Sequence, residues 1–327
     1  MAQQKQEQDL NQLLKVRRDK LADLQANGKD PFQITKFNQT HHSMEVKSLY
    51  EAHEAELLKD RAEVDVTGLD EEQAKEAVKK NILALLKEKY GIEEEDFISA
   101  ELEAVPTGPA RDYGIDRSMI MGYGHDDKVC AYPSLAALLN ADNLDKTGVC
   151  VLVDKEEIGS VGATGMHSRF FENMTAEVME RMGQYSELKL RRALTASNML
   201  SSDVNAAFDP NYASVSEKKN TSFFGNGMVF MKYTGARGKS GSNDASAEYL
   251  AALRKVMDDA DVSFQTAELG KVDIGGGGTI AYILANLDMN VIDSGIAVQN
   301  MHAPYEVISK ADLYETLKGY EAFLKNA

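Results

Sequence analysis

The sequence predicts an α/β fold, a three-layer sandwich in which helices cover both faces of a mostly parallel mixed sheet. Two observations lead to this prediction. From about residue 115 to the end of the 327-residue chain, short apolar segments alternate with segments whose apolar residues recur at helical spacing. Hydrophobic residues make up 43% of the chain, which is enough for a large buried core.

Residues 1–69 are polar and rich in charge, and they predict a small helical appendage in front of the sandwich. Residues 10–28 place apolar side chains at helical spacing and end at Gly28, and residues 45–61 repeat this spacing. Segment 62–68 alternates as a strand does, but no strand-like segment follows that could pair with it.

The elements of the sandwich follow in chain order. Residues 70–90 predict an amphipathic helix that ends at Gly91, and residues 96–114 alternate like the edge strand of a sheet. Segment 148–154, GVCVLVD, predicts a buried strand, because its residues are almost all apolar. A helix is expected near 170–184.

The second half of the chain continues this alternation. The pattern predicts strands at 194–203 and 227–235, followed by a helix at 244–260. Residues 271–287 predict a strand, a glycine turn and a helix, and further strands are expected within 289–307. Ser309 and Asp312 form an S-x-x-D cap, so a final helix is expected to begin there.

Charge and composition exclude several classes of protein. The net charge of −16 argues against general binding to nucleic acid, which needs a basic surface. No segment approaches the roughly 20 apolar residues that cross a membrane, and the first residues contain no apolar stretch typical of a secretory signal. Cys130 and Cys150 lie in apolar surroundings and are expected to be buried, reduced thiols, so we expect a cytoplasmic protein.

Acidic residues and one histidine lie where predicted strands end. In open α/β sheets the functional residues gather at the carboxyl ends of strands, and carboxylates with an imidazole suit zinc or a similar divalent ion. Two adjacent glutamates fit a site where one binds metal and the other acts as a base on water. Each residue alone could equally belong to an exposed turn, a solvated loop or a helix cap, so the hypothesis rests on their joint placement. The residues are Asp126, Asp127, Glu156, Glu157, Asp203 and His302.

Six segments in this order resemble the zinc aminopeptidases of the aspartyl aminopeptidase family. They are GIDRSMIMGYGHDDKVCAY, DKEEIGSVG, SSDVNAAFDPNY, TGARGKSGSNDASAEYL, IGGGGTIAYILAN and DSGIAVQNMHAPYEV. The resemblance runs from about residue 70 to the end of the chain. It implies a two-zinc hydrolase that removes one residue from the N-terminus of a peptide. It also implies a catalytic core at 111–327, preceded at 70–110 by a remnant of the family's inserted dimerisation domain.

The resemblance implies a metal-binding role for each matching residue. Asp126 would bridge both metal ions, with Asp127 as the alternative because the match there is ambiguous by one residue. Glu157 and His302 would bind one ion, and Asp203 would bind the other. Members of the family assemble into large oligomers, so a homo-oligomer is expected.

The remaining roles concern the substrate. By resemblance, Glu156 would be the general base, and Gly276 and Gly277 would let the substrate backbone approach. Lys232 lies where the family places a basic residue that selects an acidic N-terminal side chain, and two more basic residues follow it closely. Peptides that begin with Asp or Glu are therefore the expected substrates.

The chain departs from the family pattern in its first part. The family carries a His-x-Asp motif upstream, whose histidine binds the ion that Asp203 would hold, and no such motif occurs here. That ion would keep only Asp126 and Asp203. Residues 1–69 instead resemble the N-terminus of bacterial lysyl-tRNA synthetase at 10–32 and 62–68, but no synthetase catalytic motif follows. A smaller departure is Asn205-Ala206-Ala207, where the family often has Ala-His-Ala.

Three functions follow from these patterns. The first is a metal-dependent aminopeptidase that holds one or two Zn²⁺ ions. The second is an impaired or inactive remnant of such an enzyme. The third is a module that binds RNA or a protein partner through residues 1–69; these residues are not basic overall, so nucleic acid is the least expected partner, and no membrane is expected.

Overall fold

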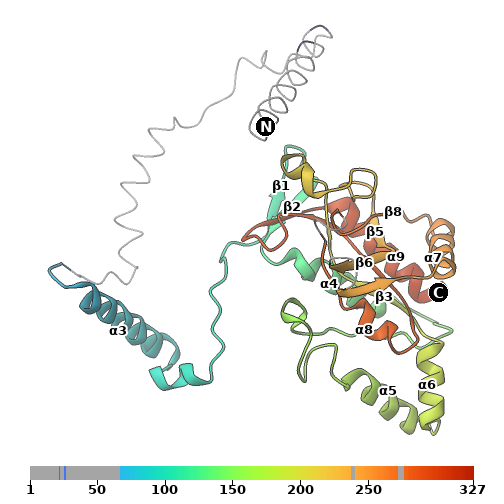
Figure 1. The fold of residues 1–327 in the computed structure, drawn as a ribbon, viewed down its shortest axis with the longest axis horizontal. Coiled ribbons are helices and arrows are strands. Elements are labelled where there is room, and N and C mark those ends of the chain that lie inside the picture. Colours follow the sequence, from blue (N-terminus) through green and yellow to red (C-terminus); the bar gives the residue numbers. More distant parts are fainter. Residues whose placement is uncertain (1–21, 23–25, 27–66, 237–239, 272–275) are drawn as a thin grey trace. The chain divides into compact units, whose positions relative to one another are not determined.

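The computed structural model describes residues 67–236, 240–271 and 276–327, together with the helical positions Ala22 and Ala26 (Figure 1). The chain divides into two compact units, Met1–Glu103 and Ala104–Ala327. The predicted catalytic core, 111–327, falls inside the second unit. Apart from Ala22 and Ala26, the helices predicted at 10–28 and 45–61 lie outside the described residues, and so does most of the strand predicted at 62–68. The domain boundaries therefore stay a prediction.

The first unit contains the predicted amphipathic helix. Helix α3 (Glu71–Tyr90) begins at Asp70, whose side chain accepts a hydrogen bond of 2.8 Å from the backbone N–H of Gln73. It ends at Gly91, which has a φ of +71°. Glycine adopts this left-handed conformation without steric cost, so the helix stops where the sequence predicts.

The central sheet of the second unit has four strands. Its order is β3 (Asn198–Ser202), β9 (Asn290–Gly295), β5 (Met228–Met231) and β8 (Phe264–Thr266). Strand β3 runs parallel to β9, and β5 runs parallel to β8, but β5 and β9 are antiparallel. The sheet is therefore mixed, as predicted.

A second sheet has five strands. Its order is β1 (Arg111–Tyr113), β2 (Met119–Gly122), β11 (Glu306–Ser309), β10 (Ala297–Gln299) and β4 (Asn205–Ala206). Strands β4 and β10 follow β3 and β9 almost directly, so two neighbouring strands continue from one sheet into the other.

Antiparallel pairs are more frequent than the sequence predicts. Within the described residues, three of the eight strand pairs are parallel. Short connections explain two of the antiparallel pairs. A parallel pair needs a long crossover connection, and the segment between β10 and β11 is too short for one. The same holds for the hairpin formed by β6 (Tyr233–Ala236) and β7 (Ser240–Asp244).

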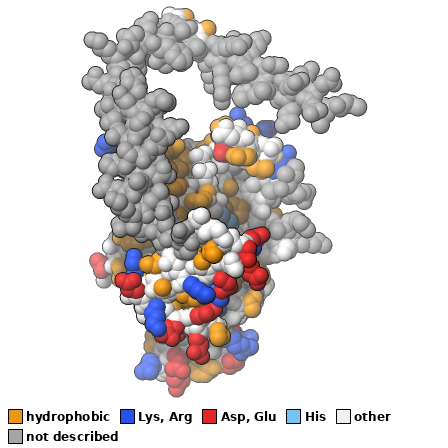
Figure 2. All heavy atoms as spheres, turned by 90° about the vertical axis from the view of Figure 1, so that its left-hand side faces the viewer, with side chains coloured by type: hydrophobic (Ala, Val, Ile, Leu, Met, Phe, Trp, Pro, Cys, Tyr) orange, Lys and Arg blue, Asp and Glu red, His pale blue; other side chains and the backbone are white. Residues whose placement is uncertain are grey.

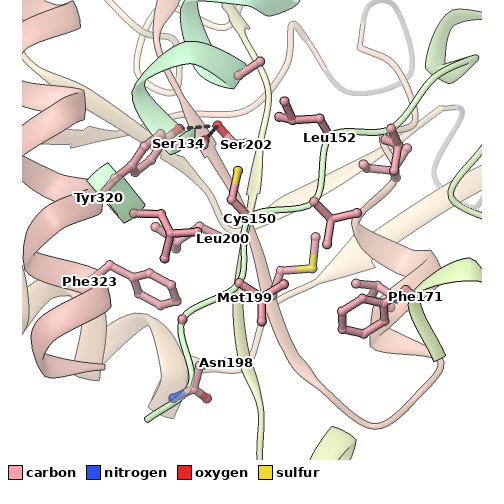
Figure 3. A pocket seen from close by; sticks show the side chains of 18 of the residues that line it. Ser134, Cys150, Leu152, Phe171, Asn198, Met199, Leu200, Ser202, Tyr320 and Phe323 are labelled. Atoms are coloured by element: carbon pink, nitrogen blue, oxygen red, sulfur yellow. Dashed lines mark hydrogen bonds between the residues drawn. The ribbon is translucent and has the colours of Figure 1, made fainter. Parts of the chain in front are cut away.

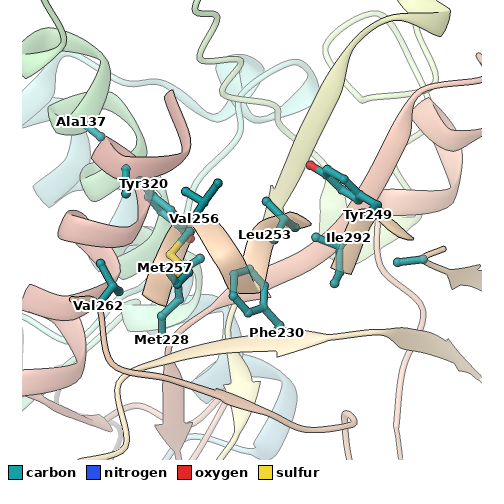
Figure 4. Packing of buried hydrophobic residues seen from close by; sticks show 12 residues of the cluster. Ala137, Met228, Phe230, Tyr249, Leu253, Val256, Met257, Val262, Ile292 and Tyr320 are labelled. Atoms are coloured by element: carbon teal, nitrogen blue, oxygen red, sulfur yellow. The ribbon is translucent and has the colours of Figure 1, made fainter. Parts of the chain in front are cut away.

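Three helices cover one face of the central sheet. Phe230 and Ile292, both fully buried, pack against residues of α4 (His125–Asn140), α7 (Ala247–Asp259) and α9 (Lys310–Asn326) (Figure 4). Burial of one such side chain stabilises the fold by about 1.5–3 kcal/mol. Helix α9 starts at the predicted cap, where the Ser309 hydroxyl accepts a hydrogen bond from the backbone of its third residue.

The opposite face is covered by three other helices. Met199 and Val291 pack against α6 (Glu187–Thr195), α8 (Ala281–Ala285) and α5 (Phe170–Arg181). The next residue along each strand, Leu200 or Ile292, packs instead on the side of α7 and α9. Successive side chains of a strand point to opposite faces, so this alternation establishes the predicted three layers.

Three predictions about local structure are wrong. Segment 148–154 forms no strand and pairs with none of the described strands, and Val149 is 48% exposed; a cavity lies between this segment and β3 (Figure 3). Residues 96–114 form a short 3₁₀ helix, η2 (Glu94–Ile98), and the brief strand β1 in place of a long edge strand. The helix expected within 271–287 is reduced to α8, and the strand expected before it lies largely outside the described residues.

The distribution of charged side chains on the surface agrees with the lack of a basic surface that the net charge predicts. Acidic and basic side chains mingle on the described part of the face that Figure 2 shows, and they form no continuous basic patch there. None of the described helices is long and apolar enough to cross a membrane.

Candidate metal centre

The predicted site residues come from four separate segments. Asp126 and Asp127 lie in the first turn of α4, where their backbone angles are not helical. Asp203 follows strand β3 directly, as predicted. His302 lies in the turn between β10 and β11, with a φ of +64°. Glu157 lies in η3 (Glu156–Ile158), which follows an extended segment and not the predicted strand.

The structure brings three of these residues together as a first ligand set, Asp126, Glu157 and His302. The Nε2 atom of His302 lies 3.0 Å from Oδ2 of Asp126 and 3.0 Å from Oε1 of Glu157. One possible ligand atom from each residue lies within 4.8 Å of the other two. Two carboxylates and one imidazole are a donor set that suits zinc.

A second ligand set consists of Asp126, Asp127 and Asp203, with ligand atoms again within 4.8 Å of one another. Asp126 belongs to both sets, in line with the bridging role that the resemblance implies for it. From the sequence, the second ion has only two expected ligands, the carboxylates of Asp126 and Asp203. The structure adds Asp127, so this neighbour of Asp126 is a further candidate ligand and not only an alternative to Asp126.

One carboxylate of the second ligand set, that of Asp127, has an oxygen without the polar partner that a buried carboxylate needs. Oδ1 of Asp127 is buried and has no hydrogen-bond partner. Burial raises the pKa of Asp127 to about 8, and burial also raises the pKa of Asp203 well above its usual range, with the charge of Asp127 as the next cause. A divalent cation would offset both the lost hydration and the mutual repulsion, so these residues fit a metal ion.

Glu156 lines the same cavity as the acidic residues of both ligand sets. Burial raises its pKa, and the adjacent charge of Glu157 is the next cause. A raised pKa makes a carboxylate a better proton acceptor, because the protonated form is then more readily reached near neutral pH.

Sequence reasoning missed Glu306. Its carboxylate is 2% exposed and accepts two backbone hydrogen bonds, one of 2.9 Å from the N–H of Asp126 and one of 2.8 Å from the N–H of His302. Glu306 therefore holds two members of the first ligand set through their backbones. The available signal was an acidic residue at the start of an apolar strand, four residues after a candidate histidine ligand.

The predicted substrate residues lie in the second unit, and no described contact joins them to either ligand set. The Nζ atom of Lys232 forms an ion pair with Asp244. Gly276 has a φ of +90°, and a Cβ there would lie 2.6 Å from the carbonyl oxygen of Leu269. The carbonyl oxygen of Gly277 accepts a hydrogen bond of 3.1 Å from a hairpin residue. Both glycines thus have a structural use here, and their role toward a substrate stays a prediction.

Residues 28–324 match the family described as aminopeptidase I zinc metalloprotease (M18). The match starts well before residue 70, where the sequence resemblance begins. It therefore overlaps the segment that resembles lysyl-tRNA synthetase, and that second resemblance stays a prediction.

Relatives with curated names support the same family. The chain is 62% identical over 258 residues to a probable M18 family aminopeptidase 1 of Clostridium acetobutylicum, which covers 79% of this chain and 56% of the relative. It is 47% identical over 254 residues to the protein of that name from Thermotoga maritima, with 77% and 56% covered. The chain thus spans little more than half the length of these relatives.

Solved structures of related proteins share the fold. The crystal structure of aminopeptidase I from Clostridium acetobutylicum matches with a TM-score of 0.71 and 60% identity, over 80% of this chain and 56% of that chain. The M18 family aminopeptidase from Thermotoga maritima matches with a TM-score of 0.74 and 45% identity, over 80% and 57%. From the family match and these identities, we conclude that the chain belongs to the M18 family of aminopeptidase I zinc metalloproteases.

Proposed function

We propose that this chain is a metal-dependent aminopeptidase, which hydrolyses the first peptide bond of a peptide. The observation that carries the proposal is the pair of ligand sets that share Asp126, in a chain of the M18 family. The first ligand set would hold one Zn²⁺ ion through Asp126, Glu157 and His302. The second would hold another through Asp126, Asp127 and Asp203.

In the proposed reaction, Glu156 moves the proton. When bound by these residues, a zinc ion would lower the pKa of the attacking water and polarise the substrate carbonyl. A carboxylate oxygen of Glu156 accepts a proton from the attacking water, whose oxygen adds to the carbonyl carbon. The C–N bond then breaks, and the proton on Glu156 passes to the leaving amine. This role is supported by the place of Glu156 in the cavity beside both ligand sets and by its raised pKa.

A preference for peptides with N-terminal Asp or Glu is part of the proposal. It rests on the family resemblance and on Lys232. The ammonium group of Lys232 is paired with Asp244, so an acidic substrate side chain would have to compete with that carboxylate. Lys232→Met should therefore reduce the ratio of kcat/KM for a Glu substrate to that for a Leu substrate.

Assembly and location are two further parts of the proposal. The relative from yeast, aminopeptidase 1, has been solved as a dodecamer, and its 20% identity to this chain reflects a shared fold. We propose a homo-oligomer here on that analogy. A cytoplasmic location is supported by two free thiols: Cys130 is fully buried, as predicted, whereas Cys150 is only partly buried, contrary to the prediction.

The main test combines metal content with activity. The purified chain is freed of loosely bound metal, its zinc per chain is determined by elemental analysis, and release of N-terminal Asp, Glu and Leu from short peptides is measured. The proposal expects one or two zinc ions per chain and chelator-sensitive release. Glu156→Gln should remove the activity and keep the zinc, because the residue belongs to neither ligand set.

An inactive remnant is the second candidate function. It is favoured by one observation, that among the described residues the second ligand set consists of three aspartates and no histidine. It predicts bound zinc without any release of N-terminal residues. That outcome, at full zinc content, would overturn the aminopeptidase proposal and leave the metal site in place.

A further inference from the structure

We propose that Asp293 is a positioning residue for the substrate, and that it acts through two threonine hydroxyls on the segments that carry Lys232 and the glycines at 276–278. This role rests on the proposed function, because it concerns the substrate of that same site. Asp293 lies in β9, is fully buried and belongs to neither ligand set. Its carboxylate is the end point of a chain of hydrogen bonds.

Three hydrogen bonds run in one direction toward Asp293. The hydroxyl of Thr234 donates a hydrogen bond of 2.7 Å to Oδ2 of Asp293. The Oγ1 atoms of Thr234 and Thr279 lie 3.3 Å apart, and since the single proton of Thr234 is already used, Thr279 is the donor in this pair. Oγ1 of Thr279 accepts a hydrogen bond of 3.4 Å from the backbone N–H of Ala281 in α8. We call Asp293, Thr234 and Thr279 the hydroxyl chain.

Each threonine of the hydroxyl chain lies next to a predicted substrate residue. Thr234 is in β6, two residues after Lys232. Thr279 directly follows the glycine segment 276–278. Both threonines are buried, so water does not compete for their hydroxyls. Asp293 therefore connects both substrate segments to strand β9 through one carboxylate.

The two substrate segments also lie directly against each other. The backbone N–H of Gly235 donates a hydrogen bond of 3.1 Å to the carbonyl oxygen of Gly277. A Cβ at Gly241, in β7, would lie 3.3 Å from the Cα of Gly278. All four residues are glycines, so no side chain separates the two backbones at these points. A shift of one segment is therefore passed to the other, and Asp293 fixes the position of both.

Strand β9 connects the hydroxyl chain to the metal centre. It continues almost directly into β10, and His302 of the first ligand set follows β10. Ser294, the residue after Asp293, accepts a hydrogen bond of 3.0 Å from the backbone N–H of Asp203 in the second ligand set. The hydroxyl chain therefore determines where the substrate segments lie relative to both ligand sets.

The burial of Asp293 indicates a use other than stability. Burial raises its pKa to about 6, so the surroundings disfavour its ionised form. Apolar side chains of similar volume often stabilise a fold as well as buried charged groups do. A carboxylate that accepts hydrogen bonds does what an apolar side chain cannot, because it selects one arrangement of the two hydroxyls and thus one arrangement of the two segments.

The test compares two substitutions at Thr234. Thr234→Val removes the hydroxyl and keeps a side chain of similar shape, whereas Thr234→Ser keeps the hydroxyl and loses a methyl group. The control is Thr316→Val in α9, because Thr316 is fully buried and its hydroxyl donates a hydrogen bond of 2.8 Å to the backbone carbonyl of Asp312 in the same helix. The control thus loses a buried hydrogen bond that no substrate segment shares.

Two measurements need no turnover. The first is hydrogen exchange, in which the amides of Gly235 and Ala281 should exchange about tenfold faster in Thr234→Val, because the hydroxyl chain no longer holds them. The second is the dissociation constant of a dipeptide analogue, Glu-Leu with its peptide bond reduced to CH₂–NH, for the zinc-loaded chain. This constant should rise about tenfold in Thr234→Val and stay within about twofold of the unmodified value in Thr234→Ser and Thr316→Val.

Steady-state kinetics separates positioning from a general loss of stability. Thr234→Val should raise KM for a Glu substrate about tenfold and keep kcat within about twofold, because substrate that does bind meets the same Glu156 and the same metal ligands. The ratio of kcat/KM for a Glu substrate to that for a Leu substrate should fall, since Lys232 begins the displaced hairpin. Zinc per chain should stay unchanged.

Each outcome decides between alternatives. Equal exchange rates in Thr234→Val and the unmodified chain would overturn the positioning role and leave the aminopeptidase proposal in place. Equal dissociation constants in Thr234→Val and Thr234→Ser would do the same. An equal loss of binding in Thr316→Val would attribute the effect to stability and also overturn the role. Absence of binding and turnover in the unmodified, zinc-loaded chain would overturn the aminopeptidase proposal together with the positioning role.

Discussion

The carboxylate of Glu306 offers a sharp test of how the first ligand set is held. Its two oxygens accept the backbone N–H groups of Asp126 and His302. Glu306→Gln keeps the volume of the side chain but replaces one acceptor oxygen with an NH₂ group. One of the two backbone N–H groups then loses its acceptor and faces a donor. We expect the affinity for zinc to fall, because the two ligand residues are no longer fixed by one rigid group.

The magnitude follows from the hydrogen bond that is lost. A hydrogen bond to a charged acceptor stabilises a structure by about 1.5–3 kcal/mol. If this hydrogen bond forms only when Asp126 and His302 are positioned to bind zinc, its loss corresponds to a decrease in zinc affinity of roughly 10- to 150-fold. This range agrees with the effect of about 10- to 100-fold that is usual for residues that orient metal ligands.

The matched control is Asp312, which is equally buried. Its two oxygens accept hydrogen bonds of 2.9 and 2.8 Å from the backbone N–H groups of Gly225 and Gly227. Asp312→Asn should lower the free energy of unfolding to a similar extent and leave zinc affinity unchanged. Zinc dissociation constants are measured by competition with a chelator of known affinity. An unchanged constant in Glu306→Gln, or an equal change in both variants, would refute the positioning role.

Three further predictions concern stability. Burial raises the pKa of Asp293 to about 6 from 3.8, so between these values the folded protein retains a proton that the unfolded chain releases. The free energy of unfolding should therefore fall by roughly 2 kcal/mol between pH 4 and 6, and Asp293→Asn should flatten this profile in denaturant titrations. Leu253→Ala, at a side chain 1% exposed, should lower the free energy of unfolding by about 2–5 kcal/mol, and Leu188→Ala by no more than about 0.5 kcal/mol, as measured by urea unfolding. Gly276→Ala should lower the free energy of unfolding by about 1–3 kcal/mol, because Gly276 has a positive φ and a close contact. The same change at Gly277, where a Cβ would meet the nearest atom at 3.5 Å, should be nearly neutral. Equal melting temperatures of the two variants would contradict this prediction.

The sequence predicts that the candidate metal residues gather at one place, because their types and positions are informative together, and the fold does bring three of them together. Asp126, Glu157 and His302 come from distant segments, yet each follows or precedes a strand or helix end, and the fold gathers such ends. Glu306 escapes prediction for a physical reason. Its role depends on which backbone N–H groups approach it, and this is a property of two turns that meet in space and not of the local sequence.

Segment 148–154 shows a different limit. Its composition is that of a buried strand, but a strand needs a neighbour with free backbone groups at the correct distance. The edge of β3 lies across a cavity from it, so hydrogen bonding is not completed within the described residues. Apolar composition indicates the environment in which a segment would be stable, and it does not show which strand would pair with it.

The continuous course of β3–β4 and β9–β10 has a consequence for the order of unfolding events. Asp203 lies at the junction of β3 and β4, and its N–H donates a hydrogen bond of 3.0 Å to Ser294 of the neighbouring strand. His302 follows β10. Ligands of both sets are thus fixed to one pair of strands that belongs to two sheets at once. Neither sheet can come apart without separating the ligands, so release of bound metal and loss of the fold should form one cooperative transition.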